Sequence, residues 1–332
     1  MNKKILLVKF SSLGDVIHSF PAVSEMIEKG YQISWAVEEA YAPLVSQYPN
    51  VKEVIAVPLR RLVKESKFWF LSKEWKEVQG KIKAEKYDKI IDAQGLIKSA
   101  IFSSLCRGEK NGYNRQSVRE GFASFFYDRR YFVDKNLHAS ERTRILCSKA
   151  LDYRLPLFKP ENYPILKWQG GSKNLFFFHG TTWVSKTLPF NTWKQIADFA
   201  KISGYKIKVF YSNANEKLFC EVLSKTHDVL ISPPKTIWQI AQELENAAGV
   251  IGVDTGLTHL SDNMGVPTLG IFGATDANLV GLRGKHSANL SVLTPCKCKD
   301  CTQHGAEVAN SCMSQFSAYE IWDQWTSLIL KI

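Results

Sequence analysis

Short apolar runs alternate with segments of helical spacing along both halves of the chain, and this alternation constrains the fold more than any other feature. The runs, rich in β-branched residues, are 5–8, 33–37, 54–57 and 89–92, then 175–178, 206–211, 229–232, 249–253 and 268–272. The helical segments are 16–28 and 73–84, then 191–202, 215–223 and 237–245, with Asn191 and Asn215 as expected N-caps. Strands that alternate with helices form parallel sheets covered on both faces. We predict an α/β protein.

Prolines and paired glycines mark a break between the two halves. In one short stretch neither the helical spacing nor the alternation of apolar runs continues, and it contains Pro156, Pro160, Pro164, Gly170 and Gly171. A chain of 332 residues is long for one core and sufficient for two domains. We predict doubly wound, Rossmann-like domains over 1–155 and 172–315 that face a central cleft. A helix in 316–332 would pack on a core, with the first domain as one candidate.

The composition limits the chemical classes of partner that this chain could bind. The net charge is +11, which suits phosphorylated small molecules, nucleic acid or anionic lipid head groups. No nucleic-acid signature accompanies the charge, so we expect no nucleic-acid partner. No apolar run could span a bilayer, and the amino-terminal apolar run is too short for a signal peptide. We therefore expect a cytoplasmic protein.

The seven cysteines are an odd number in a chain without an export signal, which argues against paired disulfides. Four of them fall late, with a C-x-C-x-x-C spacing: Cys296, Cys298, Cys301 and Cys312. This group could bind zinc or an iron–sulfur cluster, but it matches no standard pair of C-x-x-C knuckles. The alternative is a loop with reduced thiols.

The segment from Gly252 to His259 predicts a phosphate site. It follows an apolar strand and opens a helix, so free backbone N–H groups and the helix dipole would attract an anion beside Asp254, Thr255 and Gly256. His259 lies one turn into this helix, where it is either a satisfied core residue or a cleft residue.

Small hydroxyl residues and a lysine follow the first strand of the second half. Thr181 and Thr182 could donate hydrogen bonds to a diphosphate, and Lys186 could supply a positive charge. The alternative is an ordinary solvated turn.

The first loop of the chain, from Lys9 to His18, is neither a P-loop nor a G-x-G-x-x-G fingerprint. Asp15 could accept a proton from a substrate hydroxyl, or it could cap the helix that begins there. Ser11, Ser12 and Gly14 make the loop small and polar, which leaves room for a substrate.

A basic run formed by Arg60, Arg61, Lys64 and Lys67 precedes three aromatic residues, Phe68, Trp69 and Phe70. The run could grip anionic groups and touch a lipid surface, or it could be a solvated charged segment.

Taken together, these segments resemble the ADP-heptose glycosyltransferase family of GT-B fold, the heptosyltransferases of lipopolysaccharide core synthesis. The matching pieces run in the family's order: V-K-F-S-S-L-G-D-V-I-H (8–18), W-A-V-E-E (35–39), I-D-A-Q-G-L-I-K-S-A (91–100), H-A-S-E-R-T-R (138–144), H-G-T-T-W-V-S-K (179–186) and V-D-T-G-L-T-H-L (253–260). The S-S-L-G-D-V-I-H loop is similar to that of the members that add the first heptose to Kdo on lipid A.

The resemblance implies a single inverting displacement with ADP-heptose as donor and Kdo-lipid A as acceptor. Asp15 would be the general base, Lys186 would neutralise the leaving ADP, and Thr181 and Thr182 would hold the diphosphate. Further donor-site residues would be Asp254, Thr255, Gly256 and His259, together with Glu216 at the ribose and Lys235 beside the adenine. The chain lacks a D-x-D pair, so we expect no metal and no cofactor.

The resemblance also implies an acceptor-binding first domain and a nucleotide-sugar-binding second domain. Kdo carboxylates and lipid A phosphates would meet Ser12, Arg60, Arg61, Lys64, Arg115, Arg119 and Arg142. We expect a monomer, peripheral on the cytoplasmic face of the inner membrane.

Three alternatives stay open. The late cysteines are more familiar from the second heptosyltransferase of the pathway, which would use another acceptor. A dinucleotide-dependent oxidoreductase shares the fold class, although G-x-G-x-x-G is missing. An inactive lipopolysaccharide-binding protein would not need both Asp15 and Lys186.

Overall fold

The computed structural model describes residues 3–66, 69–159, 164–292 and 312–332. The chain divides into two compact units, Met1–Lys159 and Pro160–Ile332. The division falls inside the stretch of prolines and glycines that separates the two halves of the sequence. Lys67, Phe68, Cys296, Cys298 and Cys301 lie outside the described residues.

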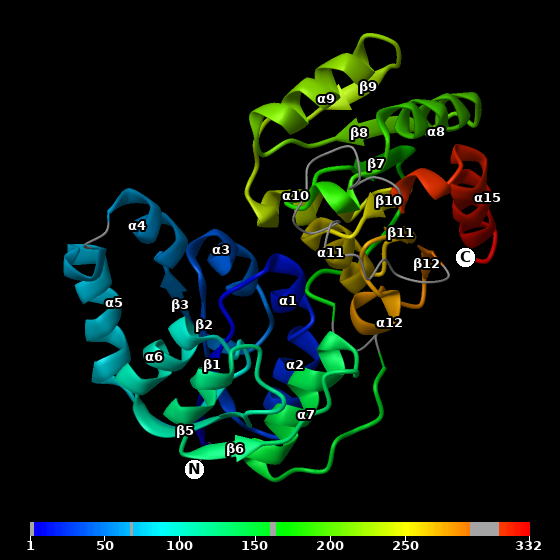
Figure 1. Ribbon diagram of the computed structural model, residues 1–332. Coiled ribbons are helices and arrows are strands. Elements are labelled where there is room, and N and C mark those ends of the chain that lie inside the picture. The colour runs from blue at the N-terminus through cyan, green and yellow to red at the C-terminus, as the bar shows by residue number, and fades with distance from the viewer. Residues whose placement is uncertain (1–2, 67–68, 160–163, 293–311) are drawn as a thin grey trace. The chain divides into compact units, whose positions relative to one another are not determined.

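The first unit is built on a six-stranded sheet whose described pairings are all parallel (Figure 1). Its order is β3-β2-β1-β4-β5-β6, with the bounds β1 Lys4–Val8, β2 Gln32–Glu38, β3 Val51–Val57, β4 Lys86–Asp92, β5 Arg107–Tyr113 and β6 Arg129–Tyr131. From β1, the strands β2 and β3 follow on one side, and β4, β5 and β6 follow on the other. This is the strand order of a doubly wound nucleotide-binding fold.

Helices cover both faces of this sheet. Leu6 and Val8 of β1 share one hydrophobic core with residues of α4 (Leu59–Glu65), α5 (Lys73–Ala84) and α6 (Ile97–Leu105). The helices α2 (Phe20–Glu28) and α7 (Ala139–Leu151) pack against each other and contact β2, β5 and β6. The shorter elements are α1 (Leu13–Ile17), η1 (Glu39–Tyr41), α3 (Ala42–Val45), η2 (Trp69–Leu71) and η3 (Gly121–Phe126).

A buried ion pair joins α2 to α7. Arg144 Nε donates to Glu25 Oε1 at 2.5 Å, and both side chains are almost fully excluded from solvent. The same guanidinium donates to Glu141 and to the carbonyl of Pro156. A buried charge is tolerated only when it is paired and hydrogen-bonded, and Arg144 meets that condition.

The second unit repeats the first in architecture. Its sheet has the order β12-β11-β10-β7-β8-β9, with the bounds β7 Asn174–Phe178, β8 Lys206–Val209, β9 Val229–Ile231, β10 Gly249–Val253, β11 Thr268–Phe272 and β12 Ser287–Ser291. Every described pairing is again parallel. From β7, the strands β8 and β9 follow on one side, and β10, β11 and β12 follow on the other. The two units therefore have the same topology.

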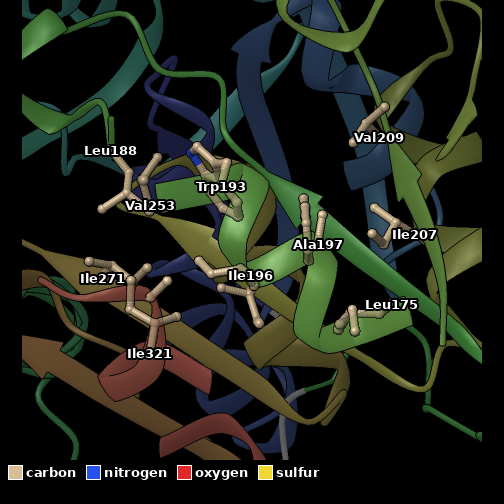
Figure 2. Packing of buried hydrophobic residues seen from close by; sticks show 14 of the residues in the cluster. Leu175, Leu188, Trp193, Ile196, Ala197, Ile207, Val209, Val253, Ile271 and Ile321 are labelled. Atoms are coloured by element: carbon tan, nitrogen blue, oxygen red, sulfur yellow. The ribbon is translucent and has the colours of Figure 1, made fainter. Parts of the chain in front are cut away.

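One face of the second sheet is covered by α8 (Phe190–Ile202), α9 (Ala214–Ser224) and α15 (Ala318–Ile329). Figure 2 shows Trp193, Ile196 and Ala197 of α8 within this core, together with Val253 and Ile271 of the sheet. The helices α10 (Ile237–Leu244) and α11 (Gly256–Met264) contact each other. The shorter elements are η5 (Val184–Lys186), α12 (Ala277–Val280) and η6 (Met313–Gln315).

The carboxyl-terminal helix belongs to the second unit and packs on the core of the second sheet. Helix α15 contacts α8, β11 and β12, and its Ile321 and Trp325 are fully buried. Gly249 of β10 makes room for the indole, because a Cβ there would lie 2.8 Å from Trp325 Cζ2. The apolar side of α15 therefore completes the core of the second sheet.

The nine strands predicted from apolar runs are confirmed, with small shifts at their ends. The strands β5, β6 and β12 were not predicted, because they carry many polar or charged residues. Segment 16–28 is divided between two helices, with Pro21 in the first turn of the second. The predicted N-caps are wrong: Pro189 caps α8, and Asn213 caps α9 by accepting the N–H of Glu216.

Within the described part of the chain, no helix is both long and apolar enough to cross a bilayer.

Truncating Trp325 tests the placement of α15. Trp325→Ala should lower the free energy of unfolding of the second unit by about 3–5 kcal/mol, because it leaves a large cavity in a closed core. Tyr319→Ala on the exposed side of the same helix should change it by less than about 0.5 kcal/mol. Urea unfolding followed by circular dichroism measures both, and equal effects would contradict the burial of Trp325.

Candidate functional site

In each unit the strand order reverses at one point of the sheet. In parallel sheets, ligands bind outside the carboxyl ends of the strands at this switch point. In the first unit the switch lies between β1 and β4, and in the second between β7 and β10. The loops that leave these four strands carry Asp15, Gln94, Lys186 and Asp254.

Asp254 is the centre of a hydrogen-bonded cluster in the second unit. It follows β10 directly, and its carboxylate is about nine-tenths buried. Lys186 Nζ, from the loop after β7, donates to Oδ2 at 2.6 Å. Thr275 Oγ1, from the loop after β11, donates to the same oxygen at 2.8 Å. His259 Nε2 lies 3.1 Å from Oδ1.

The partners of Asp254 keep it ionised. Burial alone would raise its pKa, but the hydrogen bond and charge of His259, followed by the Lys186 ammonium, hold the pKa well below the ordinary value. A carboxylate repels a diphosphate. The cluster therefore positions the lysine and the threonine hydroxyl from two loops and the imidazole from α11, so that those groups can meet an anion.

The helix start beside this cluster is suited to phosphate. Thr255 is the N-cap of α11, and Gly256 is its first residue. The first N–H groups of a helix lack partners within it and carry the positive end of its dipole. Gly252 lets α11 lie close to β10, because a Cβ there would collide with Thr258 Oγ1. Thr258 Oγ1 in turn donates to the carbonyl of Val253 at 2.7 Å.

The loop after β7 presents polar groups and an aromatic ring. Thr182 and Trp183 are exposed, and Thr181 is half-buried. Lys186 Nζ lies 5.1 Å from the centroid of the Trp183 ring. The ammonium is thus held between a carboxylate and an aromatic face, which fixes the direction of its charge.

The residues predicted at the ribose and adenine both belong to the second unit: Glu216 lies in α9, and Lys235 lies in the loop before α10. A Cβ on Gly180 would lie 2.6 Å from Glu216 Oε1, so the glycine leaves space for this carboxylate over the loop after β7. Glu216 Oε2 accepts the N–H and the hydroxyl of Ser212 at 2.6 and 2.8 Å. Lys235 is paired with Glu243, which also pairs with Lys208.

His179 of the same loop is a buried residue that the sequence presented only as part of a motif. Its ring stacks on Phe219 with centroids 3.9 Å apart, and Cys220 Sγ lies 3.9 Å from its Nε2. Burial lowers the pKa of His179 to about 4, so the imidazole is neutral at pH 7. It shapes the loop without adding charge.

In the first unit, Asp15 stands in the loop and first helical turn after β1. Its Oδ2 accepts the N–H and the hydroxyl of Ser12, each at 3.0 Å. Lys9 Nζ lies 3.4 Å from Oδ1, and Arg119 Nη1 lies 4.0 Å from Oδ2. The Asp15 side chain keeps 28% of its surface exposed, so a substrate hydroxyl can reach it.

Asp15 combines the two roles that the sequence left open. It is bonded to the N–H of the N-cap residue Ser12, as a helix cap would be. Burial by itself would raise the pKa of Asp15, but the Lys9 charge and the Ser12 N–H outweigh it. Arg119 and His18 add smaller effects, and the pKa lies well below the ordinary value. The carboxylate is ionised at neutral pH and accessible, as a proton acceptor must be.

A second loop holds the Asp15 loop in place. Gln94, after β4, accepts the N–H groups of Phe10 and Ser11 through Oε1, each at 3.0 Å. Asp92 accepts the N–H groups of Gln94 and Gly95, and it also accepts the Tyr127 hydroxyl at 2.8 Å. Burial raises the pKa of Asp92. The order of this loop therefore depends on a buried carboxyl group across the switch point.

The cationic side chains predicted to bind the acceptor differ in their exposure and in the bonds that they already make. Arg119 lies beside Asp15, and Arg115 and Lys64 are exposed. Arg60 donates to the Tyr41 hydroxyl. The remaining two guanidinium groups are engaged in the protein: Arg61 by Glu39, Glu65 and Glu74, and Arg142 by the carbonyl of Ser117.

Sequence reasoning missed Thr275, Lys9 and Gln94 as site residues. A signal existed for Thr275, because it follows β11, the strand beside β10. Gln94 likewise follows β4, the strand beside β1. Lys9 continues the apolar run of β1 and is nearly buried, with its Nζ donating to the carbonyl of Ala93. Such a lysine needs a nearby anion, and Asp15 supplies it.

Among the described residues, no group of three or more His, Cys, Asp or Glu side chains is arranged to hold a metal ion. Of the four late cysteines, Cys312 is described, and it is a buried free thiol.

The sequence matches a family described as glycosyltransferase family 9 (heptosyltransferase) over residues 75–309. Lipopolysaccharide heptosyltransferase 1 of Pseudomonas aeruginosa is 36% identical over 315 residues, which are 92% of this chain and 89% of that protein. Among solved structures, the Escherichia coli heptosyltransferase WaaC with ADP has a TM-score of 0.84 and 30% identity, covering 98% of this chain and 99% of that one. The same enzyme with ADP-2-deoxy-2-fluoro heptose has a TM-score of 0.79, with the same identity and coverage.

The pH dependence of stability tests the Asp254 cluster. Because the folded pKa lies below that of the unfolded chain, ionised Asp254 stabilises the fold above about pH 4 and loses this effect as the pH falls. Asp254→Asn should cost roughly 3 kcal/mol at about pH 5.5, because Lys186 loses its partner. Urea unfolding at about pH 3 should show a smaller difference. A difference that is constant with pH would contradict the proposed ionisation.

Proposed function

The chain belongs to glycosyltransferase family 9, the heptosyltransferases, and from that premise we propose its reaction. It transfers L-glycero-D-manno-heptose from ADP-heptose to the inner Kdo of Kdo-lipid A, in the biosynthesis of the lipopolysaccharide core. The observation that carries this proposal is the lysine ammonium held beside a helix N-terminus at the switch point of the second sheet. Similarity to WaaC, whose structures contain ADP and an ADP-heptose analogue, supports the donor.

The second unit would bind the donor. Lys186, Thr181 and Thr182 would meet the diphosphate together with the N–H groups at Thr255 and Gly256. Asp254 would orient Lys186 and His259, and would do so without touching phosphate. Glu216 would accept the ribose hydroxyls beside Gly180, and Lys235 would lie at the adenine. Fixed cationic and N–H donors suit a charge that grows on the leaving diphosphate.

The first unit would bind the acceptor and supply the base. Asp15 takes the proton of a Kdo hydroxyl while that oxygen bonds to the anomeric carbon. The bond from this carbon to ADP breaks on the opposite face, which inverts the configuration. Ionised Asp15 is a weak base, so proton transfer accompanies bond formation and does not precede it. Lys186 and the start of α11 receive the negative charge of departing ADP.

The acceptor would be bound through its own anionic groups, the Kdo carboxylates and the lipid A phosphates. Ser12 and Arg119 lie at Asp15, while Arg60, Lys64 and Arg115 offer exposed or partly exposed cationic side chains. Arg61 and Arg142 would support neighbouring loops through the bonds that they already make. An acceptor that is a lipid calls for a peripheral position on the cytoplasmic face of the inner membrane, and we expect no metal requirement.

Removing the Lys186 charge tests the donor site. Lys186→Ala should weaken ADP binding about 10- to 100-fold, the value of a lost charged hydrogen bond. Lys194→Ala, on the exposed surface of α8, should leave binding unchanged. Isothermal titration with ADP measures both, and equal affinities for wild type and Lys186→Ala would remove the lysine from the diphosphate site.

Replacing Asp15 tests the base. Asp15→Asn should bind ADP-heptose normally and transfer heptose to Kdo-lipid A about 10²- to 10⁴-fold more slowly, because the amide cannot accept the proton. Asp323→Asn, exposed on α15, should retain full turnover. Assays in EDTA test metal independence at the same time.

The outcomes separate the parts of the proposal. Unchanged turnover in Asp15→Asn would return Asp15 to the role of a helix cap. Wild-type protein that binds ADP-heptose but transfers only to already heptosylated Kdo-lipid A would have the acceptor of the second heptosyltransferase. Loss of transfer in EDTA that added divalent ions restore would overturn metal independence.

A further inference from the structure

An apolar surface on the first unit is left uncovered within that unit. Its exposed side chains come from α6 and η3, and the most exposed are Phe122 at 74% and Phe125 at 59%. We call this surface the aromatic face and define it as Ile97, Ile101, Phe122, Phe125 and Phe126. Large apolar side chains gathered in this way mark an interaction site more often than single exposed ones do.

The aromatic face is a built feature and not a frayed loop. The two segments contact each other, and the rings of Phe122 and Phe125 lie 6.1 Å apart. Glu120, just before η3, accepts the N–H of Ile97 at 2.6 Å and donates its own N–H to the carbonyl of Gly95. Ser124, between the phenylalanines, is buried and donates to the carbonyl of Gly121. The fold therefore holds the rings outward.

The surroundings of the aromatic face are cationic. Between Ile97 and Phe132 the sequence has seven lysines and arginines but three acidic residues. Lys98, Arg119 and Arg130 are exposed close to the apolar side chains in the sequence. Two of the acidic residues accept hydrogen bonds from backbone N–H groups: Glu120 from Ile97, and Asp128 from Lys110. Apolar rings with a basic rim match an anionic lipid surface, because rings enter the acyl region while cations stay at the head groups.

The aromatic face also follows closely in the sequence on a residue of the candidate acceptor site. Arg119 Nη1 lies 4.0 Å from Asp15 Oδ2, and Phe122 is three residues further along the chain. A lipid surface that receives Phe122 would therefore lie close to the carboxylate that acts on the acceptor.

We propose that the aromatic face docks this protein on an anionic lipid bilayer by inserting Phe122 and Phe125 among the head groups. Its use in presenting a lipid acceptor to Asp15 rests on the proposed function, while the docking itself does not. This surface does not include the cations Arg60, Arg61 and Lys64 of α4.

Vesicle binding tests the docking. Full-length protein is centrifuged with vesicles of phosphatidylcholine, or of an equal mixture of phosphatidylcholine and phosphatidylglycerol. The wild type should bind the mixed vesicles and only weakly the neutral ones, and Phe122→Ser/Phe125→Ser should lose at least about tenfold in affinity. Ile202→Ser, which removes an exposed isoleucine of α8 in the second unit, should bind as the wild type does. Circular dichroism and thermal melting verify that each variant is folded.

Three results would overturn the proposal: equal vesicle binding by the double variant and the wild type, no vesicle binding by the wild type, or equal affinity for neutral and anionic vesicles. A wild-type dimer that the double variant dissociates in sedimentation would instead assign the aromatic face to a second copy of the chain.

A transfer assay separates this proposal from the proposed function. The double variant should use Kdo-lipid A dispersed in detergent as well as the wild type does, and should lose activity when the acceptor is embedded in anionic vesicles. Equal activity in both formats would overturn the role in presentation. Failure of the wild type in both formats would count against the proposed function, and vesicle binding would still decide the docking.

Discussion

The reversal of strand order beside β1 and beside β7 is the constraint on which both candidate sites depend. Parallel strands need crossover connections of one hand, so two connections that leave in opposite directions open a crevice at the carboxyl ends of the strands. The apolar strands set this topology, and the polar loops that follow them fall at the crevice as a consequence. At one reversal, Gln94 accepts the N–H groups of Phe10 and Ser11 in the loop that leads to Asp15. Lys186 and Asp254 meet at the other.

The same pair of charges serves opposite purposes in the two units. At β1, the ammonium of Lys9 is nearly buried while the carboxylate of Asp15 remains partly exposed, so the carboxylate is the member of this pair that a substrate could reach. At β10, the carboxylate of Asp254 is buried and saturated by donors, so the ammonium of Lys186 is the group available. Burial decides which member of each pair faces the ligand. In the proposed reaction, one type of ion pair would thus provide a base in the first unit and an anion site in the second.

The sequence predicted what depends on local pattern and missed what depends on distant neighbours. Continuous apolar runs such as 249–253 identified buried strands, and the Asp254-Thr255-Gly256 turn identified the start of α11. The polar strand β5 could not be recognised, because its place in the sheet comes from β4 and β6 on either side. The engagement of Arg61 by three carboxylates, one of them after β2 and another on α5, is likewise a tertiary effect. The exposure of Phe122 and Phe125 likewise depends on the packing of η3.

In the proposed reaction, the weak basicity of Asp15 would link the steps assigned to the two units. A carboxylate stabilised by Lys9 and Arg119 would not remove the proton of an alcohol before the new bond forms, so the proton would move as the leaving diphosphate departs. The barrier is then sensitive to the charge that develops on the diphosphate. Preorganised donors at such a charge are each worth about 3–4 kcal/mol in enzymes that use them. Holding Lys186 against Asp254 in advance supplies such a donor without reorganisation during the reaction. The proposed reaction would therefore depend strongly on stabilisation of the leaving group, and the buried Asp254 cluster would provide it by holding Lys186 in place.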